Sequence, residues 1–327
     1  MTSARSDAGA RSLSDFDGDF DQLGQLMHHS WSENQAQALL YSPRFLQSFL
    51  QQPGATSYLA PTIYHGPTPV GFVAGFPRRV RYRDREWNIV VITLLTIAPE
   101  QKKMGYGIVL WSELVKRAQA LGFDGMMNYC IDGEPMNGMI TGCCQRMKLP
   151  VEHVFSVNYL TSVLWPKGPD QQPELPFEDT EAFLTAAASA SSSAEIARRW
   201  TPEEVRWQCS REGAVVATHQ AGSHFGLMTG SIMELTDENR TRTLLVDDIL
   251  WGSLEGEERT ALARKFTTMA AVRGARIASV PILGYADMEP FRAARFRASA
   301  RRLHAYFTLW KDSPILGPVE SLYLDVF

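Results

Sequence analysis

Apolar residues recur three or four positions apart over 20–27 and again over 39–50, which predicts two amphipathic helices near the start of the chain. Strand-like runs follow at 57–64 and 70–76, joined by a His-Gly-Pro sequence that is typical of a hairpin connection. The most continuously apolar run of the chain lies at 87–98. Such a run indicates a central strand that is covered on both faces.

A second series of elements follows this central strand. The apolar stripe that begins at Leu110 predicts a helix, and Gly122 ends it. Strand 125–131, helix 137–147 and strand 153–165 complete the first half. The sequence therefore predicts helices, a hairpin, a long strand, a helix, a strand, a helix and a final strand, in that order.

The second half repeats this order of elements. The helix-ending residues Gly122 and Gly274 lie 152 residues apart, and the same offset places 94–97 of the first central strand on the apolar run 246–249. A period of this length indicates two copies of one domain and not a solenoid. We expect an N-terminal domain over 15–166 and a C-terminal domain over 177–327. The proline-rich segment 167–176 is the expected linker.

Composition narrows the class of protein. Of 327 residues, 45% are hydrophobic and 21% are charged, which excludes wholesale disorder, and a net charge of −4 gives no overall attraction to nucleic acid or membrane. Residues 1–14 read as a disordered leader without a signal-peptide core. The four cysteines lack metal-ligand spacing. We expect a cytoplasmic protein, a monomer or a homodimer, with no metal and no membrane span.

The segment Pro99–Gly107 has the composition of a phosphate-binding turn. It joins the central strand to the long helix and contains Lys102, Lys103, Gly105 and Gly107. Glycines let the backbone approach an anion, and a helix N-terminus adds free amides and a partial positive charge. The segment contains neither the P-loop string nor the dinucleotide fingerprint Gly-x-Gly-x-x-Gly.

This strand, loop and helix resemble the acyl-CoA pyrophosphate loop of the GNAT N-acetyltransferase superfamily. That family's loop has Arg or Gln, then two residues, Gly, one residue, and Gly or Ala, and here Lys102, Gly105 and Gly107 hold those places. Lys keeps the positive charge but loses bidentate geometry. The resemblance implies an α/β (α+β) fold of two tandem GNAT-like domains, each with a mixed central sheet flanked by helices.

The resemblance also implies a donor and its binding residues. Acetyl-CoA or another acyl-CoA would be the co-substrate. Its pantetheine arm would bond the backbone near Leu95, Thr96 and Ile97, because the family's central strand splays from the next strand. Its pyrophosphate would bind the amides of the loop. The expected cofactor-binding residues in and after that loop are Lys102, Lys103, Met104, Gly105, Tyr106, Gly107 and Asn137.

The catalytic acid and base are less clearly marked. The family's second helix commonly carries a Tyr that faces the thioester sulfur, and in this register Cys144 stands at that place. Cys144 could donate a proton, act as a nucleophile, or be a buried core residue. Tyr129, Asp132 and Glu134 are the other candidates, with a helix cap or a solvated turn as the alternative for the two carboxylates.

The second copy differs in charge. Its corresponding loop, 251–258, is acidic and should repel a diphosphate, so we expect this domain to be degenerate as a cofactor site. Asp247 and Asp248 lie in its central strand. Two arginine clusters, 78–85 in a predicted turn and 292–302, could be solvated surfaces or could hold an RNA backbone.

These observations predict an N-acyltransferase that moves an acyl group, most simply acetyl, to the amine of a small molecule by direct attack on the thioester. One alternative is an aminoacyl or other unusual acyltransferase of specialised metabolism, with aminoacyl-tRNA or a carrier-bound donor. A third is a non-catalytic ligand-binding protein. The missing Tyr at position 144 favours the second or third option, whereas the retained loop glycines oppose the third.

Overall fold

The computed structural model describes residues 11–32, 39–133, 136–165, 177–236, 240–310 and 317–326, and of Met136 and Asn137 only the backbone. The strands in chain order are β1 (Arg11–Asp15), β2 (Leu39–Leu40), β3 (Pro61–His65), β4 (Thr68–Tyr82), β5 (Arg85–Ile97), β6 (Gly125–Ile131), β7 (Glu152–Val163), β8 (Ile196–Arg199), β9 (Ala214–Ala221), β10 (His224–Leu235), β11 (Arg242–Leu250), β12 (Ile277–Ile282), β13 (Arg297–Leu309) and β14 (Leu322–Tyr323). The helices are α1 (Phe20–Ser32), α2 (Pro43–Leu50), α3 (Tyr106–Ala120), α4 (Met136–Met147), α5 (Thr180–Ser193), α6 (Pro202–Ser210), α7 (Gly256–Val272) and α8 (Glu289–Ala293), with the 3₁₀ turns η1 (Ser57–Leu59) and η2 (Pro99–Met104).

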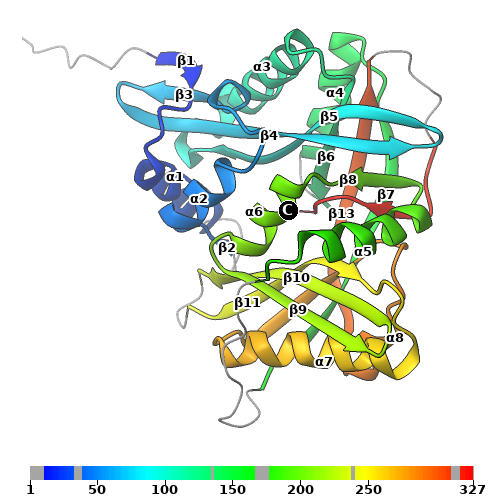
Figure 1. Ribbon diagram of the computed structural model, residues 1–327. Coiled ribbons are helices and arrows are strands. Elements are labelled where there is room, and N and C mark those ends of the chain that lie inside the picture. The colour runs from blue at the N-terminus through cyan, green and yellow to red at the C-terminus, as the bar shows by residue number, and fades with distance from the viewer. Residues whose placement is uncertain are drawn as a thin grey trace, which may run out of the picture.

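All of these strands belong to one mixed sheet. The main path runs β1-β3-β4-β5-β6-β13-β7-β12-β11-β10-β2, while β9 pairs with β10, and β8 pairs with β4 and β14. Most neighbours are antiparallel, but β5 pairs with β6 and β11 pairs with β12 in parallel. Figure 1 shows the first half above, the second half below, and β7 and β13 running side by side between them.

The two halves are interlocked through their last strands. β13, from the second half, lies between β6 and β7, and β7, from the first half, lies between β13 and β12. Each half therefore places its final strand inside the sheet of the other. The order β6-β13-β7-β12 reads the same from either end when equivalent strands are exchanged, as expected for a duplicated domain with two-fold symmetry.

This exchange qualifies the expected division of the chain. The tandem GNAT-like architecture is confirmed, with α3 and α7 following β5 and β11 as the 152-residue offset predicts. The limits 15–166 and 177–327 describe two copies in sequence but not two separable units in space. The proposed linker lies outside the described residues.

Two local expectations are wrong. The end of the expected leader is ordered, because Arg11–Asp15 pairs with β3 over its full length. The expected arginine-rich turn is mostly strand, since β4 continues to Tyr82 and pairs with β5 up to Arg85. The polar alternation of that segment reflects a strand with one buried face and not a loop.

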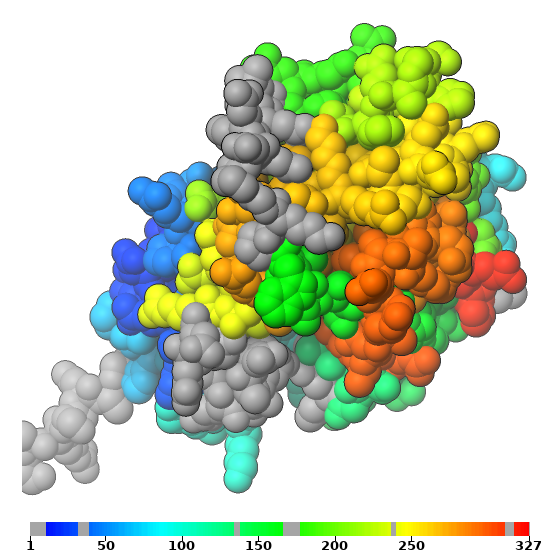
Figure 2. Space-filling model, turned by 90° about the horizontal axis from the view of Figure 1, so that it is seen from below, coloured from blue at the N-terminus to red at the C-terminus, as the bar shows by residue number. Residues whose placement is uncertain are grey.

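Helices cover both faces of the first half. α3 and α4 pack over β4, β5 and β6 through a cluster that includes Leu110, Trp111 and Leu114, and α1 and α2 cover the opposite face through Leu23, Leu46 and Phe72. Seen from below, second-half residues, coloured yellow to orange, form much of the surface, and the blue N-terminal helices lie at one side (Figure 2). Within the part of the chain described, no helix is long and apolar enough to cross a membrane.

Candidate active site

The N-terminus of α3 lies at the end of β5, where the sequence predicts the phosphate-binding turn. η2 carries Lys102 and Lys103 on its exposed side and ends at Gly105, which has a left-handed φ of +75°. Gly105 begins α3 without a side-chain cap, and a Cβ atom built there would meet nothing within 4 Å. The turn is therefore not filled by other side chains.

The backbone amides at this turn are arranged as an anion site requires. The first helical hydrogen bonds of α3 run from the N–H groups of Ile108 and Val109 to the carbonyl of Gly105. The preceding N–H groups, from Gly105 to Gly107, cannot reach a carbonyl one turn earlier in this helix. The positive end of this 15-residue helix follows directly after the two exposed lysines.

β5 separates from β6 beside this turn. The parallel pairing covers only Ile89–Ile92 against 125–128, whereas β5 continues to Ile97 and stays paired with β4. The segment 93–97, which contains Leu95, Thr96 and Ile97, thus has no strand on its β6 side within the described structure. The resemblance implies that a pantetheine arm would bind along this unpaired segment.

A bulge in β5 marks the point of separation. The register with β4 shifts between Phe72 and Ala74, and Leu94 has a φ of +57°, which is unfavourable for a residue with a side chain. The sequence carries no signal for this bulge, because Leu94 is apolar like its neighbours. Two nearby carbonyls already accept side-chain hydrogen bonds, that of Leu94 from Thr96 and that of Ile97 from Ser30 at 2.9 Å.

The candidate proton donors lie on opposite faces of the sheet. Cys144 is buried in the α3–α4 cluster, with Sγ 3.9 Å from Thr308 Oγ1. Burial raises the pKa of the Cys144 thiol to about 11, so it is protonated at neutral pH. Tyr129 faces the other side, and burial raises its pKa well above the usual value, with a further contribution from Asp325. Its hydroxyl has no hydrogen-bond partner among the described residues.

The candidate carboxylates are placed differently. Asp132 is exposed after β6, and its Oδ1 lies 3.3 Å from His304 Nε2 on β13. His304 Nδ1 lies 3.1 Å from Ser156 Oγ on β7, so side chains of both halves meet here. Glu134 lies outside the described residues. Asn137 lies in the first turn of α4, which passes the loop, since a Cβ on Gly107 would be 3.3 Å from Met139 Sδ.

Part of the chain matches a known protein family. The profile of the Acetyltransferase (GNAT) family matches residues 20–136, which span α1 to the start of α4 and include the loop and segment 93–97. The segment 20–136 thus carries the sequence pattern of the GNAT family. This family match supports an acyltransferase. No curated protein sequence matches the chain.

Solved structures share their fold with almost the full length of the chain. A Saccharomyces cerevisiae N-myristoyltransferase solved with bound myristoyl-CoA has a TM-score of 0.74 at 13% identity, with 97% of this chain and 89% of that one covered. A putative acetyltransferase from Pyrococcus horikoshii gives a TM-score of 0.54 at 11% identity, over 96% of this chain and 94% of that one. These identities establish a shared fold, not a shared substrate.

The equivalent region of the second, GNAT-like copy has a similar backbone but different side-chain contacts. β11 pairs with β12 only over Thr243–Leu245, and its register with β10 shifts where Asp247 bulges, at the position equivalent to Leu95. Arg211 and Ser231 hydrogen-bond Asp247. Asp247, at the bulge of β11, is therefore held by an internal ion pair with Arg211.

The second helix N-terminus is closed as well. In α7 the side chain of Glu258 turns back, and its Oε2 accepts the N–H of Glu255 at 3.0 Å. The same carboxylate also contacts His224 Nδ1 at 3.0 Å. A carboxylate of the protein thus caps α7, whereas no side chain caps the start of α3. The contrast between the two copies is the main structural reason to place an anion at α3 alone.

The described residues contain no group of three or more His, Cys, Asp and Glu side chains suited to hold a metal ion. The arginine cluster 78–85 does not form one patch: Arg78 is buried against Asp325, and Arg81 donates to the carbonyls of Ser191 and Ala194. Asp325 was missed from the sequence, although a single acid in an apolar C-terminal run is a signal for a buried partner.

Proposed function

We propose that this chain is an N-acyltransferase that moves an acyl group from coenzyme A to the amine of a small molecule by direct attack on the thioester. The observation that carries the proposal is the uncapped N-terminus of α3 beside the gap between β5 and β6. The amides from Lys103 to Gly107 would hold the pyrophosphate. The backbone of 95–97 would align the pantetheine arm, and Lys102 and Lys103 would add positive charge.

Acyl-CoA supplies an activated carbonyl with a thiolate leaving group. The amine attacks this carbonyl, the C–N bond forms, the C–S bond breaks, and the amine proton must reach a base while the thiolate takes a proton. Tyr129 and Cys144 are both held in the protonated form by burial, which suits an acid and not a base. Asp132 with His304 is the described candidate for proton acceptance, and Glu134 remains a candidate by sequence.

The identity of the acyl group on the donor is a further part of this proposal. The matched family is named for acetyl transfer, and the N-myristoyltransferase structures that share the fold hold a much longer acyl chain. Acetyl-CoA is therefore the first donor to test, and longer acyl-CoAs are the second.

Calorimetric titration with acetyl-CoA tests the loop. We expect binding by the wild type, loss of binding in Gly105→Trp, and at least about tenfold weaker binding in Lys102→Glu/Lys103→Glu because two cations near the diphosphate are reversed. The charge variant is needed because Gly105→Trp is also strained at positive φ. Lys116→Glu, on the exposed side of the same helix, is the matched control and should bind as the wild type does. Equal affinity in all four proteins would reject this site.

A tRNA-borne donor is the second candidate function. Arg297, Arg301 and Arg302 are exposed on β13, where Arg301 stacks over Tyr159 and Arg302 donates to Asn158. No ion pair with a carboxylate is found for these three side chains in the described structure. If they bind RNA, the purified protein should carry nucleic acid, and its RNA affinity should fall steeply with salt. Absence of both effects would remove this candidate.

A further inference from the structure

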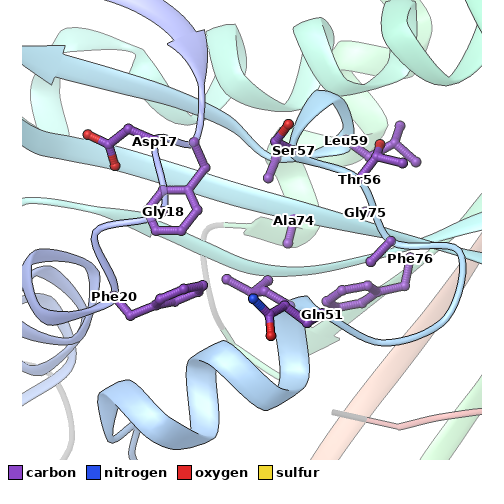
Figure 3. A pocket seen from close by; sticks show the side chains of 14 residues that line it. Asp17, Gly18, Phe20, Gln51, Thr56, Ser57, Leu59, Ala74, Gly75 and Phe76 are labelled. Carbon is purple, nitrogen blue, oxygen red and sulfur yellow. The ribbon is translucent and has the colours of Figure 1, made fainter. Parts of the chain in front are cut away.

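A pocket of about 420 Å³ lies in the first half, on the face opposite α3. It is enclosed by the segment that precedes α1, the end of α2, η1 and the middle of β4 (Figure 3). Its apolar lining includes Phe16, Phe20, Leu50, Leu59, Ala74 and Phe76. Pockets of this size bind small molecules or parts of them.

The polar groups of this pocket lie at its rim. Gln51, Thr56 and Ser57 line it and are exposed. The carboxylate of Asp17 points away from the cavity in Figure 3, and its Oδ1 accepts the N–H of Asp19 at 3.0 Å. No other charged residue lines the pocket. Its interior thus suits an uncharged apolar group, because a buried charge without a partner would be strongly unfavourable.

The floor of the pocket adjoins the bulge of β5. Ala74 pairs with Thr93, the last residue before the bulge, and Phe72, Ala74 and Phe76 pack in one cluster with Leu94. The helix that would hold the pyrophosphate packs on the other face of the same strands. The pocket thus lies on the sheet face opposite α3, beside the β5 segment that the proposed function assigns to the donor.

We propose that this pocket binds an apolar group of roughly six to ten carbons that belongs to one of the two substrates of the transfer reaction. The inference rests on the proposed function for its substrates but on different residues. The group is either the acyl chain of the donor or the apolar body of the amine acceptor. An acetyl group alone would leave most of the pocket unused.

Two ligand series separate these sources. Saturated acyl-CoAs from acetyl to dodecanoyl are titrated calorimetrically, and unbranched primary amines from ethyl to decyl are compared as acceptors with acetyl-CoA held constant. We expect one series to improve roughly threefold to fourfold per added methylene until the pocket is filled. Improvement in the first series assigns the pocket to the donor, and improvement in the second assigns it to the acceptor.

Two variants change the size of the cavity. Ala55, half-buried at the pocket, is replaced by Phe to fill it, which should move the optimum to chains several carbons shorter while the affinity for CoA itself is unchanged. Phe20→Ala should move the optimum to longer chains. Ala221→Phe, at a half-buried alanine at the end of β9 in the second half, is the matched control and should leave the optimum unchanged.

Flat responses in both series, or an unchanged optimum in Ala55→Phe, would overturn the inference even if CoA binds as proposed. A titration with 1-octanol alone tests the pocket without the CoA site. Octanol binding that Ala55→Phe abolishes would support the pocket even if CoA failed to bind. Octanol binding that is absent, or equal in the wild type and in Ala55→Phe, would count against it.

Discussion

Replacement of Asp325 by Asn should strongly destabilise the protein, because this carboxylate joins the two halves inside the molecule. Asp325 forms ion pairs with Arg78 of β4 and with Arg198 of β8. The exposed fractions of the three side chains are 9%, 0% and 1%. Both arginines are therefore shielded from the water that would otherwise stabilise their charges.

The size of the stability loss depends on which partners each arginine retains after the substitution. Arg198 retains Glu204 at 3.0 Å, whereas Arg78 retains only neutral partners, Gln52 and the carbonyl of Pro77. Removal of one partner from a buried ion pair typically costs about 3–5 kcal/mol. Because whole domains are stable by about 5–15 kcal/mol, Asp325→Asn should lose a large part of the free energy of unfolding.

Urea unfolding at neutral pH measures this loss. Asp84→Asn, in the exposed turn between β4 and β5, is the control and should change the free energy of unfolding by less than about 0.5 kcal/mol. A loss below about 1 kcal/mol in Asp325→Asn would refute the reasoning, because it would mean that water or another group compensates Arg78.

Acid titration gives an independent check of the same pair. Burial alone would raise the pKa of Asp325, but the charges of Arg198 and Arg78 outweigh burial and lower the pKa below its usual value. A lowered folded-state pKa stabilises the fold above the unfolded-state pKa of about 3.9, and this contribution is lost as pH falls through the folded value. The stability of Asp325→Asn should therefore fall less steeply below about pH 4 than that of the wild type.

Three further predictions concern single residues. Gly105→Ala should lower the free energy of unfolding by about 1 kcal/mol through its positive φ, since no steric contact opposes the methyl group, and urea unfolding would show this. Cys144→Ala should keep turnover within about twofold, and thiol reagents should label Cys144 slowly at pH 7.5, because its pKa of about 11 leaves little thiolate; a 100-fold loss of turnover would restore a catalytic role. Burial raises the pKa of Asp248 to about 7, so its neutral form stabilises the fold at low pH and this contribution is lost as pH rises toward 7. Asp248→Asn should therefore match the wild type near pH 4 and be more stable at pH 8 by urea unfolding, and an equal loss of stability at both values would contradict this.

The sequence by itself determined the local elements and the duplication. The apolar run at 87–98, the glycine-containing loop and the helix after it are signals within a few neighbouring residues, and the structure places β5, η2 and α3 there. The opposite charges of the two loops are likewise local, and the prediction drawn from them is that only the first copy binds a diphosphate. Such features are readable because periodicity and turn chemistry act between residues close in sequence.

Only the tertiary structure decided which strands pair and which side chains meet. The exchange of β7 and β13, the bulge at Leu94, the ion pairs of Asp325 and the pocket above β4 join segments far apart in the chain. An apolar strand pattern records that a residue is buried but not which strand covers it. Cys144 shows the same limit, because its register suggested chemistry and only the structure shows it buried in the α3–α4 cluster; its catalytic role stays a prediction. Which strands pair depends on the packing of side chains over the whole sheet. A pattern within a few neighbouring residues does not specify that packing.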